Sequence, residues 1–193
     1  EQHGKFGIFG NFGIFGNFGD LRKDGPILTT RMSDIEAKPI HWLWPDRIAR
    51  GKLSIIAGHP GLGKSQITAF IAGVVSTGGR WPVDNYPCEA GDVLFISAED
   101  DPADTIRPRL EAVQANLDRI HVMSSNVFME SDSDTQKTKP FSLDQHLSQL
   151  AATVAKLGNI AVVIIDPITA YLGKVDSHKN ADVRALLGPL ASF

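Results

Sequence analysis

Cysteine is almost absent from this chain, in which Cys88 is the only one among 193 residues. A single cysteine excludes an intrachain disulfide and excludes a zinc site built from several thiolates. The sequence therefore fits a reducing compartment, and we expect a cytoplasmic protein.

Long apolar runs and a surplus of basic charge are missing too. No run approaches the roughly 18 apolar residues of a membrane-spanning helix, and the first residues lack the pattern of a secretory signal. Nineteen Lys and Arg against 22 Asp and Glu give a net charge of −3. This balance excludes a global basic surface for nucleic acid, although a local loop or a ring channel can still bind it. The hydrophobic content of 42% is that of one ordinary globular domain without a membrane partner.

Glycine and phenylalanine are concentrated near the beginning, where residues 6–20 repeat F-G-x. The period is too short for a solenoid, and the tract lacks the proline of collagen. A phase-separating or pore-type segment is one interpretation, and a disordered repeat without a role is the other, which the composition favours. We predict a flexible leader over 1–34 and a folded domain over 35–193.

An aromatic stretch, His41 to Pro45, opens the folded domain and predicts an edge strand or a packed turn. Trp42 and Trp44 have two interpretations. They can flank a nucleotide base, or they can cover the edge of a core, and the second is the more common role of such side chains.

The most informative stretch runs from Gly58 to Ser65 and fits the pattern G-x-x-x-x-G-K-[ST] at every fixed position. The apolar residues 53–57 before it predict a buried strand. After it, apolar residues at spacings of three and four predict a helix over 65–76, ended by Thr77-Gly78-Gly79. Strand, glycine loop and helix are the arrangement that binds a nucleoside triphosphate.

The chemistry of this loop follows from its residue types. Glycines let the backbone N–H groups point at phosphate oxygens, and the helix N-terminus adds partial positive charge. Lys64 is expected to reach the β- and γ-phosphates of ATP, and the Ser65 hydroxyl is expected to ligate Mg²⁺. The predicted nucleotide-binding residues are Gly58, His59, Pro60, Gly61, Leu62, Gly63, Lys64, Ser65 and Gln66.

Strands and helices alternate through the rest of the chain. Short apolar runs predict strands over 93–98, 119–123 and 160–165. We predict a helix that begins at Pro102, or only near Thr105 because Pro108 is awkward in a regular helix, and continues to about Leu117. A second helix is predicted from Ser142 to Gly158, opened by a capping box with Gln145, and a polar surface loop is predicted over 124–140. The pattern predicts an α/β fold of doubly wound type around a mostly parallel sheet.

Acidic residues follow two of these strands. Ligands of such sheets lie at the carboxyl ends of the strands, where Glu99 and Asp166 are both expected. Asp166 is predicted to hold Mg²⁺ together with Ser65. Because Pro167 occupies the position after it, we predict Glu99 as the group that orients the attacking water, with Asp100 and Asp101 capping the next helix.

Four segments together resemble a RecA-type ATPase, and within that group the AAA-family ATPases related to the plasmid replication helicase RepA. They are residues 45–51, 58–65, 95–101 and 163–167. The resemblance covers about residues 38–193 and implies a three-layer RecA-like fold. It also implies that Glu99 is the catalytic glutamate, that subunits assemble as a homo-oligomeric ring, often a hexamer, and that single-stranded DNA occupies the channel.

The resemblance also indicates parts that we expect beyond Phe193, because no sensor strand and no arginine finger is found. Lys174 and Lys179 lie where related rings place a channel loop, although lysines of polar loops are more often only solvated. Arg107 and Arg109 are predicted on a solvated helix face.

The leading hypothesis is an ATPase that acts as a helicase or loader in DNA replication or mobile-element maintenance. A nucleotide-gated regulatory or scaffold protein is the second hypothesis. A small-molecule kinase is the third, although no acceptor pocket or arginine-bearing lid is recognisable.

Overall fold

The computed structural model describes residues 29–124, 128–130 and 137–173. The chain divides into two units, Glu1–Pro39 and Ile40–Phe193. The described part of the first contains a single 3-10 turn, Met32–Asp34. The F-G-x repeat, Lys174 and Lys179 lie outside the described residues. The boundary between a leader and an ATPase domain at residue 34 stays a prediction.

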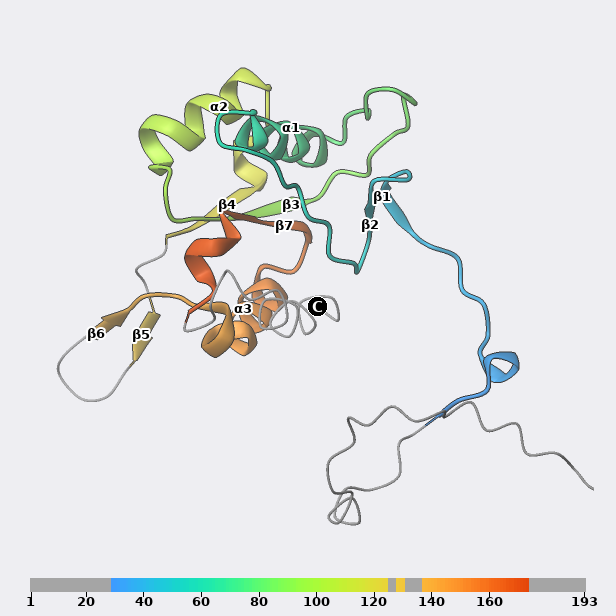
Figure 1. Cartoon of the computed structure of the whole chain (residues 1–193). Helices are drawn as coiled ribbons and strands as arrows, with labels where there is room; N and C mark the ends of the chain where they lie inside the picture. The colour runs from blue at the N-terminus through green and yellow to red at the C-terminus, as the bar shows by residue number, and fades with distance from the viewer. Residues whose placement is uncertain (1–28, 125–127, 131–136, 174–193) are drawn as a thin grey trace, which may run out of the picture. The chain divides into compact units, whose positions relative to one another are not determined.

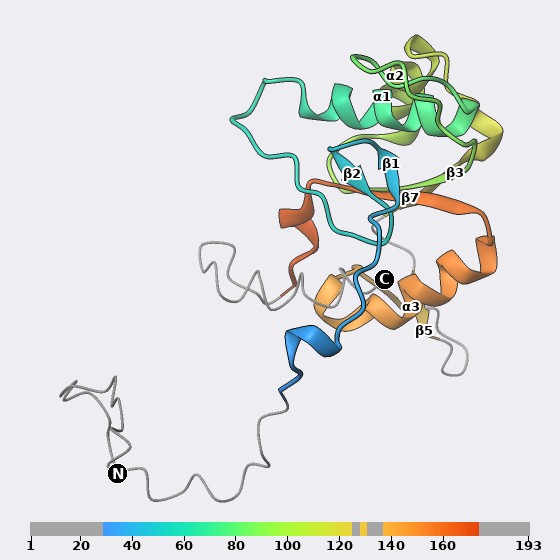
Figure 2. The ribbon, with the colours of Figure 1, turned by 90° about the vertical axis from the view of Figure 1, so that its right-hand side faces the viewer.

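A parallel sheet of three strands forms the centre of the second unit. Its order is β4-β3-β7, with β3 at Asp92–Ser97, β4 at Ile120–Ser124 and β7 at Ile160–Asp166. Helices α1 (Lys64–Thr77) and α2 (Arg107–Ala112) lie on one face, and α3 (Leu143–Leu157) lies on the other (Figures 1 and 2). The predicted fold class, a three-layer α/β RecA-like fold with a parallel sheet, is confirmed.

The central strand β3 carries apolar side chains on both faces. Val93 and Phe95 belong to the core cluster beneath α1 and α2, while Leu94 and Ile96 belong to the cluster above α3. Successive side chains of a strand point to opposite faces, so a continuous apolar run is what a strand between two helical layers requires. All four side chains are at most 5% exposed.

The helix α1 begins and ends at glycines. Gly63 precedes it with φ 77°, and Gly78 follows it with φ 66°. The left-handed conformation at Gly78 lets its N–H turn back to the carbonyls of Val74 and Val75, and this satisfies acceptors at the end of the helix. The predicted stop at Gly78 is therefore confirmed.

The predicted helix 105–117 is wrong in its second half. A π-helical turn at Pro102–Ile106 leads into α2, and α2 ends at Ala112. Gln114 has φ 56°, a left-handed conformation that a continuing α-helix does not allow. The side-chain pattern past Ala112 is apolar for a different reason, since Ala115 packs against the core from an irregular segment and Leu117 from the start of a 3-10 helix, Leu117–Arg119.

The predicted capping box at the start of α3 is wrong. Ser142 precedes the helix, but its side chain makes no capping hydrogen bond, and His146 has the non-helical dihedrals φ −121° and ψ 18°. The backbone N–H of Ser142 donates to Nδ1 of His146 at 3.0 Å. This bond uses the backbone donor that a capping box would offer to Gln145. The predicted stop at Gly158 is confirmed.

The predicted surface loop over 124–140 is wrong in part, because two short strands lie within it. Strands β5 (Phe128–Glu130) and β6 (Lys137–Lys139) pair antiparallel. A two-stranded hairpin outside the main sheet is held by backbone hydrogen bonds and gives no long hydrophobic alternation, so its sequence signal is weak.

The predicted buried strand 53–57 is not formed. Residues 53–57 belong to neither a helix nor a strand, and Leu53, Ile55 and Ile56 are 38%, 65% and 43% exposed. The hairpin of β1 (Trp42–Trp44) and β2 (Ile48–Ala49) ends before them, and Gly51 turns the chain with φ 63°. A short apolar run becomes a strand only where a neighbour supplies its hydrogen bonds, and here no described strand pairs with it.

Trp44 of this hairpin covers the core edge, as the preferred interpretation predicted. Its ring stacks on that of Trp81 with centroids 4.6 Å apart. Trp81 is 1% exposed, and its indole N–H donates to the carbonyl of Leu43 at 2.7 Å.

Cys88 belongs to the same core cluster as Trp81, and burial raises the pKa of its thiol. In the part of the chain that the structure describes, no helix has the length and apolar character needed to cross a membrane.

Replacing Trp81 by phenylalanine is expected to lower the free energy of unfolding by about 1–3 kcal/mol. The variant keeps an aromatic ring but leaves the buried carbonyl of Leu43 without its donor. Urea unfolding measures the change, with Trp42→Phe, at a partly exposed position, as the control. Equal stability of Trp81→Phe and the parent would show that this hydrogen bond contributes nothing.

Candidate nucleotide site

The glycine loop leads directly into α1, as predicted. Gly61 and Gly63 have φ 79° and 77°, and an added Cβ would meet no atom within 4 Å at either position. Space is therefore not what requires glycine here. The left-handed backbone requires it, because side chains strain that conformation.

Lys64 is the first residue of α1, and its ammonium group is bonded to its own loop. Nζ donates to the carbonyl oxygens of Gly58 and His59, each at 2.9 Å. Residues 58–63, together with Gln66, are exposed, and Lys64 is half-buried. A bound phosphate would offer Nζ charged acceptors in place of these two neutral carbonyls.

A small pocket lies where the polar ends of β3 and β7 meet the first turns of α1. Ser97 and Asp166 are register partners at the carboxyl ends of the two strands. Ser65 joins them from the helix, so residues from three elements surround one space. The lining residues are Ser65, Thr68, Ala69, Phe95, Ser97, Asp100, Ile106, Arg109 and Asp166. Lys64, Glu99 and the loop residues are not among them.

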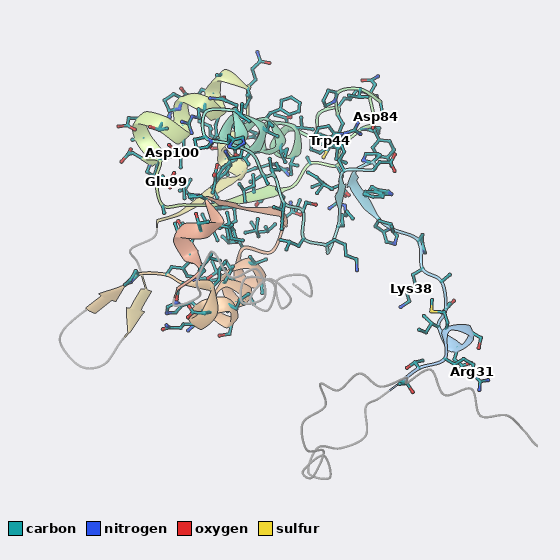
Figure 3. All side chains as sticks on the ribbon, in the orientation of Figure 1. Arg31, Lys38, Trp44, Asp84, Glu99 and Asp100 are labelled. Atoms are coloured by element: carbon teal, nitrogen blue, oxygen red, sulfur yellow. The ribbon has the colours of Figure 1, made fainter. Side chains whose placement is uncertain are left out.

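The three acids after β3 have three different environments. Glu99 is exposed, and no described residue bonds to its carboxylate. Asp100 lines the pocket and forms an ion pair with Arg109. Asp101 caps the following turn, since its Oδ1 accepts from the N–H groups of Ala103 and Asp104. The capping role was therefore predicted correctly for Asp101 and wrongly for Asp100. Figure 3 shows Glu99 and Asp100 together at this end of the sheet.

The prediction that Arg109 lies on a solvated helix face is wrong, because Arg109 lines the pocket. Its neighbour Arg107 does lie on the helix surface, where it pairs with Glu111 four residues later. Arg109 instead turns toward Asp100, and the two side chains are 30% and 28% exposed. The nine-residue separation across a π-helical turn is not a helical spacing, so no periodic pattern marks this contact.

The donor atoms around the pocket fit a magnesium ion whose remaining ligands come from the substrate and water. Mg²⁺ prefers oxygen ligands and is usually held by one or two carboxylates, substrate phosphates and water. The hydroxyl of Ser65 and the carboxylate of Asp166 are oxygen donors of this kind, and both residues line the pocket. Within the described ranges, no three His, Cys, Asp or Glu residues gather as a metal-binding group of their own.

The chain was compared with known proteins. A family model described as an AAA domain matches residues 23–193. None of the curated proteins compared with the chain matches it. The match spans all the elements that surround the pocket.

Proposed function

This chain belongs to the AAA-domain family of phosphate-loop ATPases, and from that membership we propose that it hydrolyses ATP to act on DNA. The role proposed is that of a RepA-like helicase or loader in replication or mobile-element maintenance. In this proposal, the subunits form a homo-oligomeric ring, such as a hexamer, around single-stranded DNA. The observation that carries the ATPase part is the meeting of Ser65, Ser97 and Asp166 around one pocket beside the glycine loop.

In this proposal, each residue has a role that its chemistry supports. The loop residues 58–63 and Gln66 surround the phosphates, and Lys64 neutralises their charge. Ser65 and Asp166 hold Mg²⁺, which stabilises negative charge on the phosphates when it is bound. Glu99 accepts a proton from the attacking water.

Hydrolysis assays with and without single-stranded DNA test the whole proposal. We expect ATP turnover that DNA stimulates, and light scattering is expected to show a ring in the presence of ATP. Turnover that DNA does not change would favour the regulatory or scaffold alternative. The exposed position of Glu99 is compatible with that alternative, since a protein that only binds nucleotide needs no water-orienting group.

Asp166→Asn is expected to remove most of the gain in ATP affinity that Mg²⁺ provides, by about tenfold or more. Asparagine keeps the size of the side chain but has no charge to offer the metal. The affinity of a fluorescent ATP analogue should be measured with Mg²⁺ and with EDTA. Asp118→Asn, at an exposed position away from the pocket, is the matched control. An unchanged Mg²⁺ dependence in Asp166→Asn would remove this residue from the metal site.

A further inference from the structure

Asp100 is held in the pocket from two sides. Its backbone N–H donates to the hydroxyl of Ser97 at 3.3 Å, and its carboxylate oxygen Oδ2 accepts from the Arg109 guanidinium. Ser97 is the last residue of β3, and Arg109 lies in α2. The position of the carboxylate therefore depends on both the sheet and the helix that covers it.

This carboxylate shares the pocket with the two predicted metal ligands, Ser65 and Asp166. A Mg²⁺ ion bound through one carboxylate and phosphates retains water molecules, and these need hydrogen-bond acceptors. A carboxylate accepts such bonds strongly. The negative charge of Asp100, added to that of Asp166, would by itself repel the phosphates. The guanidinium of Arg109 pairs with Asp100 and compensates for this charge.

We infer that Asp100 positions the hydrated metal by accepting hydrogen bonds from its water ligands, and that Arg109 positions Asp100. The inference rests on the proposed nucleotide site. It adds Asp100 and Arg109 to the residues already proposed there, which are the glycine loop, Asp166 and Glu99. Arg109 acts through Asp100 and compensates its charge, so the pair works as a unit.

The test uses the chain as it is and measures the affinity of a fluorescent ATP analogue over a Mg²⁺ titration and in EDTA. In Asp100→Asn, the gain in affinity from Mg²⁺ is expected to fall about tenfold, the usual size of an outer-shell effect. The affinity in EDTA is expected to stay at the parent value. Arg109→Gln is expected to act in the same direction, and the double variant to be no worse than the more severe single one. Arg109→Lys is expected to restore part of the gain.

Arg107→Gln is the matched control, because Arg107 is on the same helix and, among the described residues, pairs only with exposed Glu111. Thermal unfolding shows whether each variant is folded, and Asp100→Asn alone decides the question if Arg109→Gln does not fold. An unchanged Mg²⁺ gain in Asp100→Asn would overturn the inference, as would an equal loss of affinity in EDTA, which indicates a purely structural pair. A parent chain that binds no ATP would instead overturn the proposed function, and the inference with it.

Discussion

Lys64→Ala is expected to weaken ATP binding by about 100-fold, or about 2.7 kcal/mol. Nζ of Lys64 donates to two carbonyl oxygens of its own loop, and the phosphates of ATP would offer it stronger, charged acceptors. Alanine removes the cation, and no lysine or arginine occurs elsewhere in residues 53–63. Titration of a fluorescent ATP analogue measures the loss.

Lys52→Ala is the control, because Lys52 is exposed and precedes the loop by several residues. It removes the same charge from the chain and is expected to change the affinity little. The site assignment would be wrong if Lys64→Ala bound ATP as tightly as the parent. A similar loss in both variants would indicate a general charge effect instead.

The second large effect is expected for Glu99→Gln, in which steady-state hydrolysis should fall by about 100-fold while ATP binding survives. Glutamine keeps the size of the side chain and part of its hydrogen bonding but cannot accept the proton of the attacking water. Hydrolysis and nucleotide affinity should be measured on the same preparation, with saturating Mg²⁺.

Three variants serve as comparisons for Glu99→Gln. Glu111→Gln removes an exposed carboxylate that pairs with Arg107. Asp101→Asn affects a helix cap, and Asp100→Asn affects the metal requirement, so both should cost far less turnover once Mg²⁺ saturates the site. Near-normal hydrolysis in Glu99→Gln would reject a mechanism in which this residue activates water.

The parts of the fold that the sequence predicted well are those with a local signal. The helix α1 has an apolar face and a glycine at each end, and β3 and β7 are apolar runs that end in polar residues. These signals depend on residues within one element. The rule that carboxyl ends of parallel strands meet at one edge of the sheet predicted the place of Asp166, which lines the pocket together with Ser65 of α1.

The parts that the sequence missed depend on partners distant along the chain or on an irregular backbone. The apolar residues 53–57 had the composition of a strand, but composition does not show whether a neighbouring strand is available. The contact of Arg109 with Asp100 depends on a π-helical turn, which no spacing rule anticipates. Glu99 and Asp100 are adjacent and both acidic, so only the structure separates the exposed one from the one in the pocket.

The position of β3 between two strands and two helical layers has a consequence for the entropy of ligand binding. Backbone that is hydrogen-bonded on both sides and covered on both faces opens rarely, whereas exposed backbone opens at small cost. Ser97, at the end of β3, therefore belongs to a preorganised half of the site, and Asp166 lies beside it as its register partner on β7. The exposed residues 58–63 form the other half, and a ligand that contacts both halves restricts the backbone motion of this exposed segment. The conformational entropy lost in that segment is one of the costs that lower the affinity for ATP, beside the translational and rotational freedom that any ligand loses on binding.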